Sequence, residues 1–251
     1  MAKALKKDEE VYVPLHRIGT PNRDTGSAFL KTKVIADVVP TKRSVVVDLV
    51  CNGQTATVPT SAVHRNVGVC VYAIGDITSE RLLIDPLKES VVNFCRLIVP
   101  AGCLKERSVR SLEELKICWA NYDHAECTHI VLIGHADENG IKFAVDGQVK
   151  PEDLGCAFAT ENSIATTIVS LCCKTGRADF AKPFANASNI DCFIAPFQSV
   201  HGAIASQFFQ TYLGQHFLNG KTTKVAFKNA QSDIPTGINF RRWKNGELDK
   251  S

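Results

Sequence analysis

Two side chains of this chain, Cys173 and His135, could act together on a carbonyl carbon. A cysteine thiolate attacks carbonyl groups well, but a free thiol is only slightly ionised at neutral pH and needs a neighbouring base or positive charge. An imidazole takes up and releases a proton near neutral pH, so a histidine can serve as that partner. If the fold brings the two residues together, their chemistry is that of a cysteine hydrolase acting on peptide bonds.

Both residues follow an apolar, β-branched run that breaks into a polar loop. Ile130–Ile133 leads into Gly134 and His135, and Ile168–Leu171 leads into Cys172, Cys173 and a loop that contains Gly176. Open α/β sheets place their sites just beyond the carboxyl ends of the strands. The two residues are 38 positions apart (173 − 135). That is the length of one crossover, which predicts neighbouring strands.

From about residue 67 the sequence alternates between strand-like and helix-like segments. The expected strands are 67–75, 128–133, 166–171 and 190–197, and 240–244 is a short strand or a docked aromatic segment. The expected helices are 85–98, 111–120, one from 151, 178–187, 202–218 and 221–231, and 141–149 reads as a small hairpin. This order predicts the α/β class, with a mainly parallel sheet covered by helices on both faces.

The first part of the chain has a different composition. Residues 11–65 contain short extended runs, and Asn52-Gly53 is a strong hairpin signal between two of them. We therefore expect residues 1–65 to form a β-rich region, barrel-like or added to the sheet, and residues 66–251 to form the α/β domain. Lys and Arg outnumber the acids in this region. That excess fits either a nucleic-acid or partner surface or an ordinary solvated face.

Composition narrows the class of protein. The 251 residues are 45% hydrophobic and 22% charged, and the net charge of +3 is too small to indicate nucleic-acid binding by itself. No apolar run approaches the roughly 20 residues of a membrane span, and the basic N-terminus lacks the apolar stretch of a secretory signal. The ten cysteines include no C-x-x-C pair, so reduced thiols and a cytoplasmic location are expected, without a zinc ribbon or disulfide framework.

Taken together, residues 67–231 resemble the caspase-like cysteine peptidases of clan CD. The resemblance is carried by the apolar strand that ends in His135, and by the segment from Ile168 to Gly176, which is similar to the family's apolar-Ser-x-Cys-x-x-Gly pattern. Ile190–Gln198 and the last helix, with Gly220 before it, add to it. Within the superfamily the chain looks most like the branch of separases and bacterial CHAT domains.

The resemblance implies a mechanism and assigns its residues. Cys173, not Cys172, takes the nucleophile's place because the Gly falls three residues later, and His135 takes the proton-transfer role. The backbone N–H groups of Cys173 and Ala136 would form the oxyanion hole. The family often has Gly where this chain has Ala136, which keeps the N–H but changes the local backbone freedom. Neither a metal nor an organic cofactor is required.

The substrate is less well defined by the sequence. Relatives that cut after basic residues often have an acid two positions before the nucleophile, where this chain has Leu171. Asp137, Asp191 and His201 are the candidates for substrate binding. Relatives often cut one dedicated protein, and some bacterial ones act in antiviral defence, so the implied partner is a protein such as a pore-forming effector. The alternatives are an inactive caspase-like scaffold or sensor, and a nucleic-acid or peptide reader that acts through the N-terminal β region.

Overall fold

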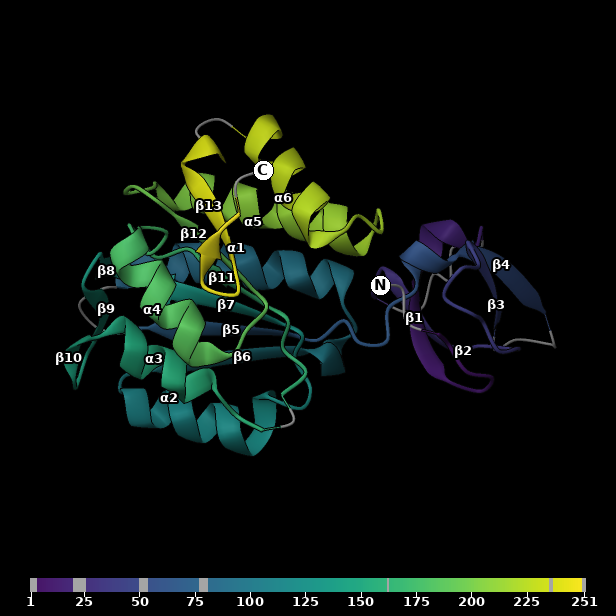
Figure 1. Ribbon diagram of the computed structural model, residues 1–251, viewed down its shortest axis with the longest axis horizontal. Coiled ribbons are helices and arrows are strands. Elements are labelled where there is room, and N and C mark those ends of the chain that lie inside the picture. The colour runs from purple at the N-terminus through teal and green to yellow at the C-terminus, as the bar shows by residue number, and fades with distance from the viewer. Residues whose placement is uncertain are drawn as a thin grey trace.

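A seven-stranded, mostly parallel sheet forms the centre of the molecule in the computed structural model (Figure 1). The structure describes residues 4–19, 26–49, 54–76, 81–161, 163–234 and 237–249. The strand order is β14-β13-β12-β11-β7-β5-β6, in which β13 runs antiparallel to β12 and β14 antiparallel to β13. The strands are β5 (Val69–Ile74), β6 (Leu104–Val109), β7 (His129–Gly134), β11 (Thr167–Ser170), β12 (Cys192–Pro196), β13 (Phe240–Lys244) and β14 (Glu247–Leu248). The expected α/β class and mainly parallel sheet are confirmed.

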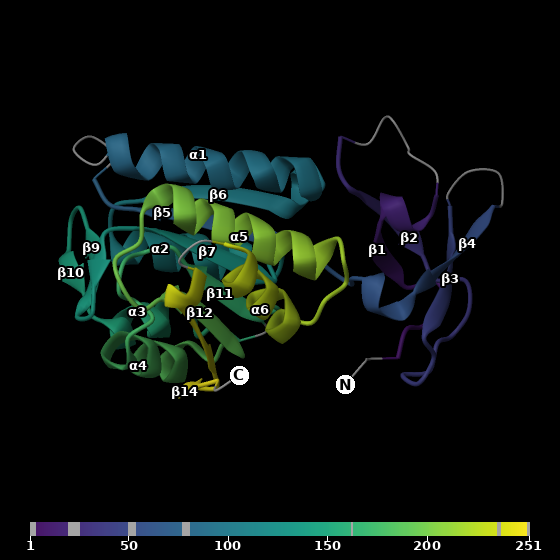
Figure 2. The same ribbon diagram turned by 90° about the horizontal axis from the view of Figure 1, so that it is seen from above.

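Among the described residues, six α-helices cover the two faces of this sheet, three on each, and Figures 1 and 2 show the two layers. One face carries α1 (Arg81–Ile98), α5 (Gly202–Phe217) and α6 (Thr223–Asp233). The other carries α2 (Leu112–Cys118), α3 (Pro151–Phe158) and α4 (Ala178–Ser188). Alternate residues of each strand enter the two cores: Val169 packs under α1 and α5, and its neighbour Ile168 packs under α3 and α4. Because successive side chains of a strand point to opposite faces, the same strands contribute to both hydrophobic cores.

The order in which strands are added to the sheet changes direction at β5, and this change creates a switch point between β5 and β7. From β5 the chain first passes through α1 to the edge strand β6, then returns to pair β7 on the other side of β5. The following strands, β11 and β12, continue outward from β7. In sheets of this type the groups that follow such central strands converge on one crevice at the carboxyl edge. The loops after β7 and β11, which carry His135 and Cys173, both begin at this carboxyl edge, next to the switch point between β5 and β7.

The predicted N-terminal β-rich region is present and has a hydrophobic cluster of its own. It contains two antiparallel pairs, β1 (Glu10–Pro14) with β2 (Phe29–Lys33) and β3 (Ser44–Asp48) with β4 (Thr55–Pro59). A bridge between Val34 and Val47 joins the pairs. In the described part of the chain these strands do not pair with the seven-stranded sheet. The expected turn at Asn52-Gly53 lies outside the described residues.

This region contacts the α/β unit at the amino edge of the sheet, where the parallel strands begin (Figure 2). His64 Nε2 lies 3.1 Å from the carbonyl oxygen of Phe217, at the end of α5, and Ala28 N–H donates to the carbonyl oxygen of Ile98, at the end of α1. Gly220 approaches so closely that a Cβ would lie 2.7 Å from Ser61 O, and its φ of +63° also favours glycine. The N-terminal region therefore lies at the opposite edge from His135 and Cys173.

Some elements differ from the sequence-based expectation. The first helix begins at Arg81, so Pro86 lies inside α1 and not at its first position as expected. The edge strand β6 was not expected, because Lys105, Glu106 and Arg107 give it a charged composition. One half of the predicted capping box of α2 is present: Ser111 Oγ accepts a hydrogen bond from Glu114 N–H at 3.1 Å, while Glu114 Oε2 accepts from Arg110 N–H, one residue before the N-cap.

Candidate active site at the carboxyl edge

The register of two adjacent strands brings His135 and Cys173 to the same edge. β7 and β11 pair in parallel, and the last register pair is Leu132 with Ser170. Leu171 N–H continues this pairing by donating to Leu132 O at 2.8 Å. His135 and Cys173 each follow three residues after that pair, both half-buried. The expectation that the two strands are neighbours is confirmed.

The turn after β11 is fixed by side chains beneath it. Ser170 Oγ accepts from Cys172 N–H at 3.2 Å and lies 2.8 Å from Thr175 Oγ1, which in turn donates to Cys172 O at 2.8 Å. Both hydroxyl residues are buried. Their three hydrogen bonds hold the turn that presents Cys173.

The two adjacent cysteines have different environments. Cys172 is fully buried, its Sγ lies 3.6 Å from Leu132 O, and burial raises the pKa of its thiol to about 12. Cys173 is half-buried, and its Sγ lies 3.9 Å from Val200 O. Only the second thiol is therefore accessible for chemistry at the edge of the sheet.

The backbone beyond Cys173 is shaped by Lys174 and Gly176. Lys174 has a φ of 60°, in the left-handed region, and its N–H donates to Gln198 O at 3.3 Å. Gly176 N–H donates to Pro196 O at 2.8 Å, and a Cβ at this position would lie 2.4 Å from Ala195 O. Glycine is needed here because β12 passes so close to it, and the turn itself is made by Lys174.

His135 leads into a small three-stranded antiparallel sheet beyond β7. It consists of β8 (Ala136–Asp137), β9 (Gly140–Phe143) and β10 (Gly147–Val149), and the hairpin of β9 and β10 is close to the expected 141–149. His135 O accepts from Lys142 N–H at 2.9 Å, and the next pair along the ladder is Ala136 with Ile141. Hydrogen-bonded and non-hydrogen-bonded pairs alternate in antiparallel ladders, so Ala136 N–H points away from β9. His135 and Ala136 line a 410 Å³ pocket on this hairpin.

Glu138 links the two loops through ion pairs. Its carboxylate lies 3.2 Å from Lys174 Nζ and 3.4 Å from an Arg177 guanidinium nitrogen. Its own backbone N–H, followed by Lys174, lowers the pKa of the Glu138 carboxyl. The loop that follows His135 is thus joined electrostatically to the loop that follows Cys173.

The three candidates for substrate binding lie in different places. Asp137 is engaged inside the hairpin: its Oδ1 accepts from Asn139 N–H at 2.8 Å and from Gln148 Nε2 at 2.6 Å. Burial alone would raise the pKa of Asp137, but these hydrogen bonds outweigh it and lower the pKa. His201 is exposed at the start of α5, where its Nδ1 accepts from Ala203 N–H at 3.2 Å.

Asp191 does not belong to this edge. It directly precedes β12, whose first residue Cys192 is paired with Thr167 at the beginning of β11. Asp191 therefore lies at the amino edge, a strand length away from Cys173. The expectation that Asp191 lies near the cleft is wrong, because the residue begins its strand, whereas His135 and Cys173 follow theirs.

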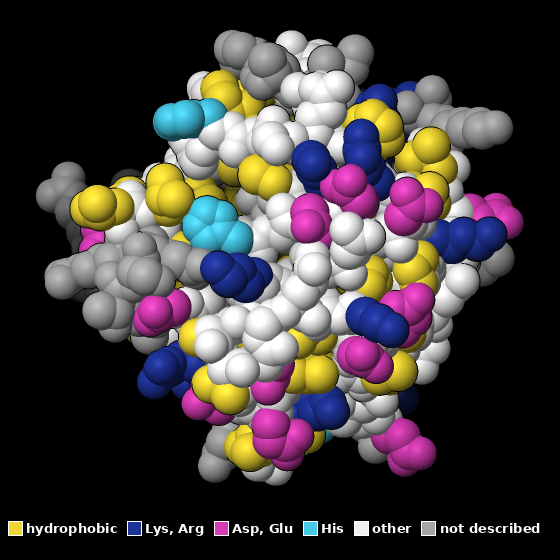
Figure 3. Space-filling view, turned by 90° about the vertical axis from the view of Figure 1, so that its left-hand side faces the viewer, with side chains coloured by type: hydrophobic (Ala, Val, Ile, Leu, Met, Phe, Trp, Pro, Cys, Tyr) yellow, Lys and Arg dark blue, Asp and Glu magenta, His cyan; other side chains and the backbone are white. Residues whose placement is uncertain are grey.

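Sequence reasoning missed an aromatic and cationic group at the same edge. Phe197 follows β12, and the guanidinium carbons of Arg177 and Arg241 lie 5.5 and 5.3 Å from its ring centroid. The rule that selected His135 and Cys173, a side chain just past a buried strand, would also have selected Phe197. Figure 3 looks onto this face, where basic, acidic, histidine and apolar side chains are interspersed.

The described ranges contain neither a candidate metal site nor a candidate membrane-spanning helix. No three His, Cys, Asp or Glu side chains are grouped there so that they could hold a metal ion, and no helix there is long and apolar enough to cross a membrane.

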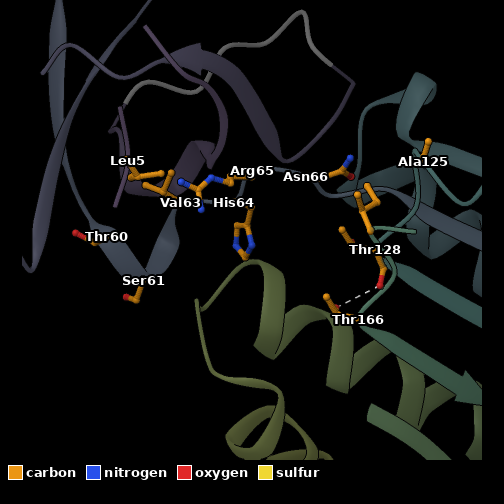
Figure 4. Close-up of a pocket in the computed structure, with 11 residues that line it drawn as sticks. Leu5, Thr60, Ser61, Val63, His64, Arg65, Asn66, Ala125, Thr128 and Thr166 are labelled. Carbon is orange, nitrogen blue, oxygen red and sulfur yellow. Dashed lines mark hydrogen bonds between the residues drawn. The ribbon is translucent and has the colours of Figure 1, made fainter. Parts of the chain in front are cut away.

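A larger pocket, of 750 Å³, lies at the opposite, amino edge, between the N-terminal region and the starts of β7 and β11 (Figure 4). Its lining includes His64, Arg65 and Thr128, and neither candidate catalytic residue.

Solved structures that are similar to this chain include C11 cysteine proteases. A secreted C11 cysteine protease from Bacteroides thetaiotaomicron, in complex with an irreversible peptide inhibitor, is similar over 72% of this chain and 66% of its own, with 11% identity and a TM-score of 0.51. An inactive zymogen C11 protease from Parabacteroides distasonis is similar over 71% of this chain and 61% of its own, at 12% identity and a TM-score of 0.45. No protein-family model and no curated protein matches the sequence. The first similarity shows that the α/β unit has the caspase-like fold.

Proposed function

We propose that this chain is a cysteine peptidase in which Cys173 is the nucleophile and His135 the proton-transfer residue. The observation that carries the proposal is the shared position of the two residues after adjacent parallel strands, with Cys173 accessible and Cys172 buried. The fold supports it, because the chain is similar in structure to a secreted C11 cysteine protease.

The proposed reaction is acyl transfer in two steps. The Cys173 thiolate adds to the peptide carbonyl carbon, and the backbone N–H groups of Cys173 and Ala136 stabilise the oxyanion that forms. His135 gives a proton to the leaving amine as the C–N bond breaks, which leaves a thioester on Cys173. His135 then takes a proton from water, whose oxygen attacks the thioester and releases the acid and the thiol. Each oxyanion donor accounts for a rate factor of about 10²–10³.

The setting of this activity is also a proposal. We place the chain near the CHAT and separase branch, with a dedicated protein substrate, such as a pore-forming effector in antiviral defence, and a cytoplasmic location. We also propose residues 1–65 and 66–251 as the two domains. Support for that division comes from the separate hydrophobic cluster of the N-terminal region. Asp137 and His201 remain proposed contacts for the substrate.

A labelling experiment tests the dyad. The protein is treated with a panel of peptidyl electrophiles, and the modified residue is identified by mass spectrometry. Cys156 is the most exposed described thiol, so a Cys156→Ser background removes the main competing reaction. We expect a single adduct on Cys173 that forms at least a hundredfold more slowly in His135→Ala.

Two results would contradict the proposal. One is an adduct rate at Cys173 that does not change in His135→Ala. The other is the absence of peptide-dependent labelling of Cys173, which would favour the inactive scaffold or sensor instead.

A further inference from the structure

An apolar pocket lies next to Cys173, between the first turns of two helices. It has a volume of 510 Å³ and is formed by the start of α1 and the start of α5, both of which follow strands that end at the carboxyl edge. Its lining includes Leu82, Leu83, Ser90, Val200, His201 and Ser206. Most of the lining residues are apolar, and none of those that the structure describes is an Asp, Glu, Lys or Arg.

Val200 connects this pocket to the thiol. Its carbonyl oxygen lies 3.9 Å from Cys173 Sγ, and the same residue lines the pocket and packs on the core beneath α1 and α5. A peptide advances about 3.3–3.6 Å per extended residue. A substrate whose carbonyl carbon lies at Cys173 can therefore place one of its first two acyl-side residues in the pocket.

The polar groups of the pocket are already paired with one another. Ser90 Oγ and Ser206 Oγ lie 2.8 Å apart, and Gln210 Nε2 donates to both, at 3.2 and 2.9 Å. His201 Nδ1 is occupied by Ala203 N–H. A charged substrate side chain would lose its hydration here without gaining an ion-pair partner among the described lining residues, whereas an apolar one would not.

Two leucines in the pocket wall are exposed to solvent. The exposed fractions of Leu82 and Leu83 are 90% and 65%, which is high for leucines at the beginning of a helix that packs on the core. An apolar side chain bound between α1 and α5 would cover part of this surface.

Resting on the proposed peptidase function, we propose that this pocket selects a bulky apolar residue, such as Leu or Phe, at one of the two substrate positions before the scissile bond. Leu83 and Val200 are the specificity-determining residues. The pocket would thus prefer an apolar substrate residue, because a basic substrate residue would need an acidic side chain in the pocket wall.

The test uses peptidyl electrophiles that share one reactive group and differ at these two positions. We expect a Leu or Phe probe to modify Cys173 at least tenfold faster than the matched Lys or Asp probe. In Leu83→Lys this preference should fall at least tenfold, and the Asp probe should gain. Leu83→Ser, which brings no charge, should lower the preference without favouring the Asp probe.

A matched control exists on the same helix. Leu97 is 72% exposed in the last turn of α1 and does not line the pocket, so Leu97→Lys should keep the full apolar preference. Equal labelling of Cys173 by all probes would overturn the pocket assignment and leave the peptidase proposal standing. Labelling of Cys173 by none of them would overturn both.

Discussion

His135 and Cys173 stand three residues beyond one register pair, Leu132 with Ser170, on neighbouring parallel strands. β7 continues to Gly134, whereas β11 ends at Ser170, so Cys173 lies in the turn after its strand. The sheet therefore brings both residues to one edge, and the turn held by Ser170 and Thr175 sets the position of Cys173. Perturbations of the loops and of the strands should accordingly have different effects.

The first prediction separates the two adjacent cysteines. Cys173→Ala should abolish peptide-dependent labelling and change the free energy of unfolding by no more than about 0.5 kcal/mol. Cys172→Ala should keep the labelling and lose about 1 kcal/mol, because it leaves a small void beside Leu132. Urea unfolding and adduct mapping measure the two effects. The opposite assignment would follow if Cys172→Ala removed the adduct.

The second prediction concerns the backbone N–H of Ala136. Ala136→Pro removes that donor but no ladder bond, because its pair with Ile141 is of the non-hydrogen-bonded kind. We expect the turnover number for a peptide substrate to fall about 10²–10³-fold with little change in melting temperature. Ala136→Gly keeps the N–H and should retain most of the activity. Equal activity of the Pro and Gly variants would exclude this donor.

The third prediction concerns the ion pairs between the two loops. Glu138→Gln weakens the contacts to Lys174 and Arg177, so the labelling rate of Cys173 should fall a few-fold. Salt screens surface charges, so high salt should slow the unmodified chain more than the variant. Glu113→Gln, at an exposed acid on α2, should behave like the unmodified chain. The prediction fails if the rate in both variants depends on salt in the same way.

The fourth prediction concerns pH and the histidines at the amino edge. His64, His129 and His216 pack together, with His129 and His216 ring centroids 5.1 Å apart. Burial, with His216 nearby, lowers the pKa of His64 to about 4, and burial also lowers the pKa values of His129 and His216. These residues are neutral in the folded chain but take up protons near pH 6.5 when it unfolds.

The direction of the effect follows from linkage. Below pH 6.5 the unfolded chain binds more protons, so stability is complete above pH 6.5 and falls as the pH drops towards 4. His64 alone should account for about 3 kcal/mol of this loss. His64→Gln keeps a donor for Phe217 O and should flatten the pH dependence between pH 6.5 and 4, as measured by urea unfolding. An unchanged slope would contradict the role of His64.

The parts of the fold that the sequence predicted were those with one dominant local signal. The buried strands were predictable because continuous β-branched runs end at Gly134 and at the Cys172-Cys173 pair. The start of α2 was predictable from Ser111 and Glu114. The edge strand β6 was not, because one of its sides is solvated and its charges hide the pattern.

The site was predictable only where a residue's place along its strand was decisive. The rule of strand ends selected His135 and Cys173, and it misplaced Asp191 because that residue lies before its strand. The apolar pocket was not predicted, because it is formed by α1 and α5, which are far apart in the sequence and meet only through tertiary packing. The left-handed backbone at Lys174 gave no signal either, since a lysine seldom adopts it.

β7 spans the distance between two unlike environments. It begins at the buried His129, against the end of α5, and leads to His135 at the opposite edge, roughly 20 Å away for six extended residues. One end of β7 thus lies near the contact with the N-terminal region, and the other end leads to the proposed catalytic residue His135. The acid-induced loss of stability at the His129 end and the loss of labelling at the His135 end should therefore be recorded as two separate transitions, and any coincidence between them would measure how rigidly β7 couples its ends.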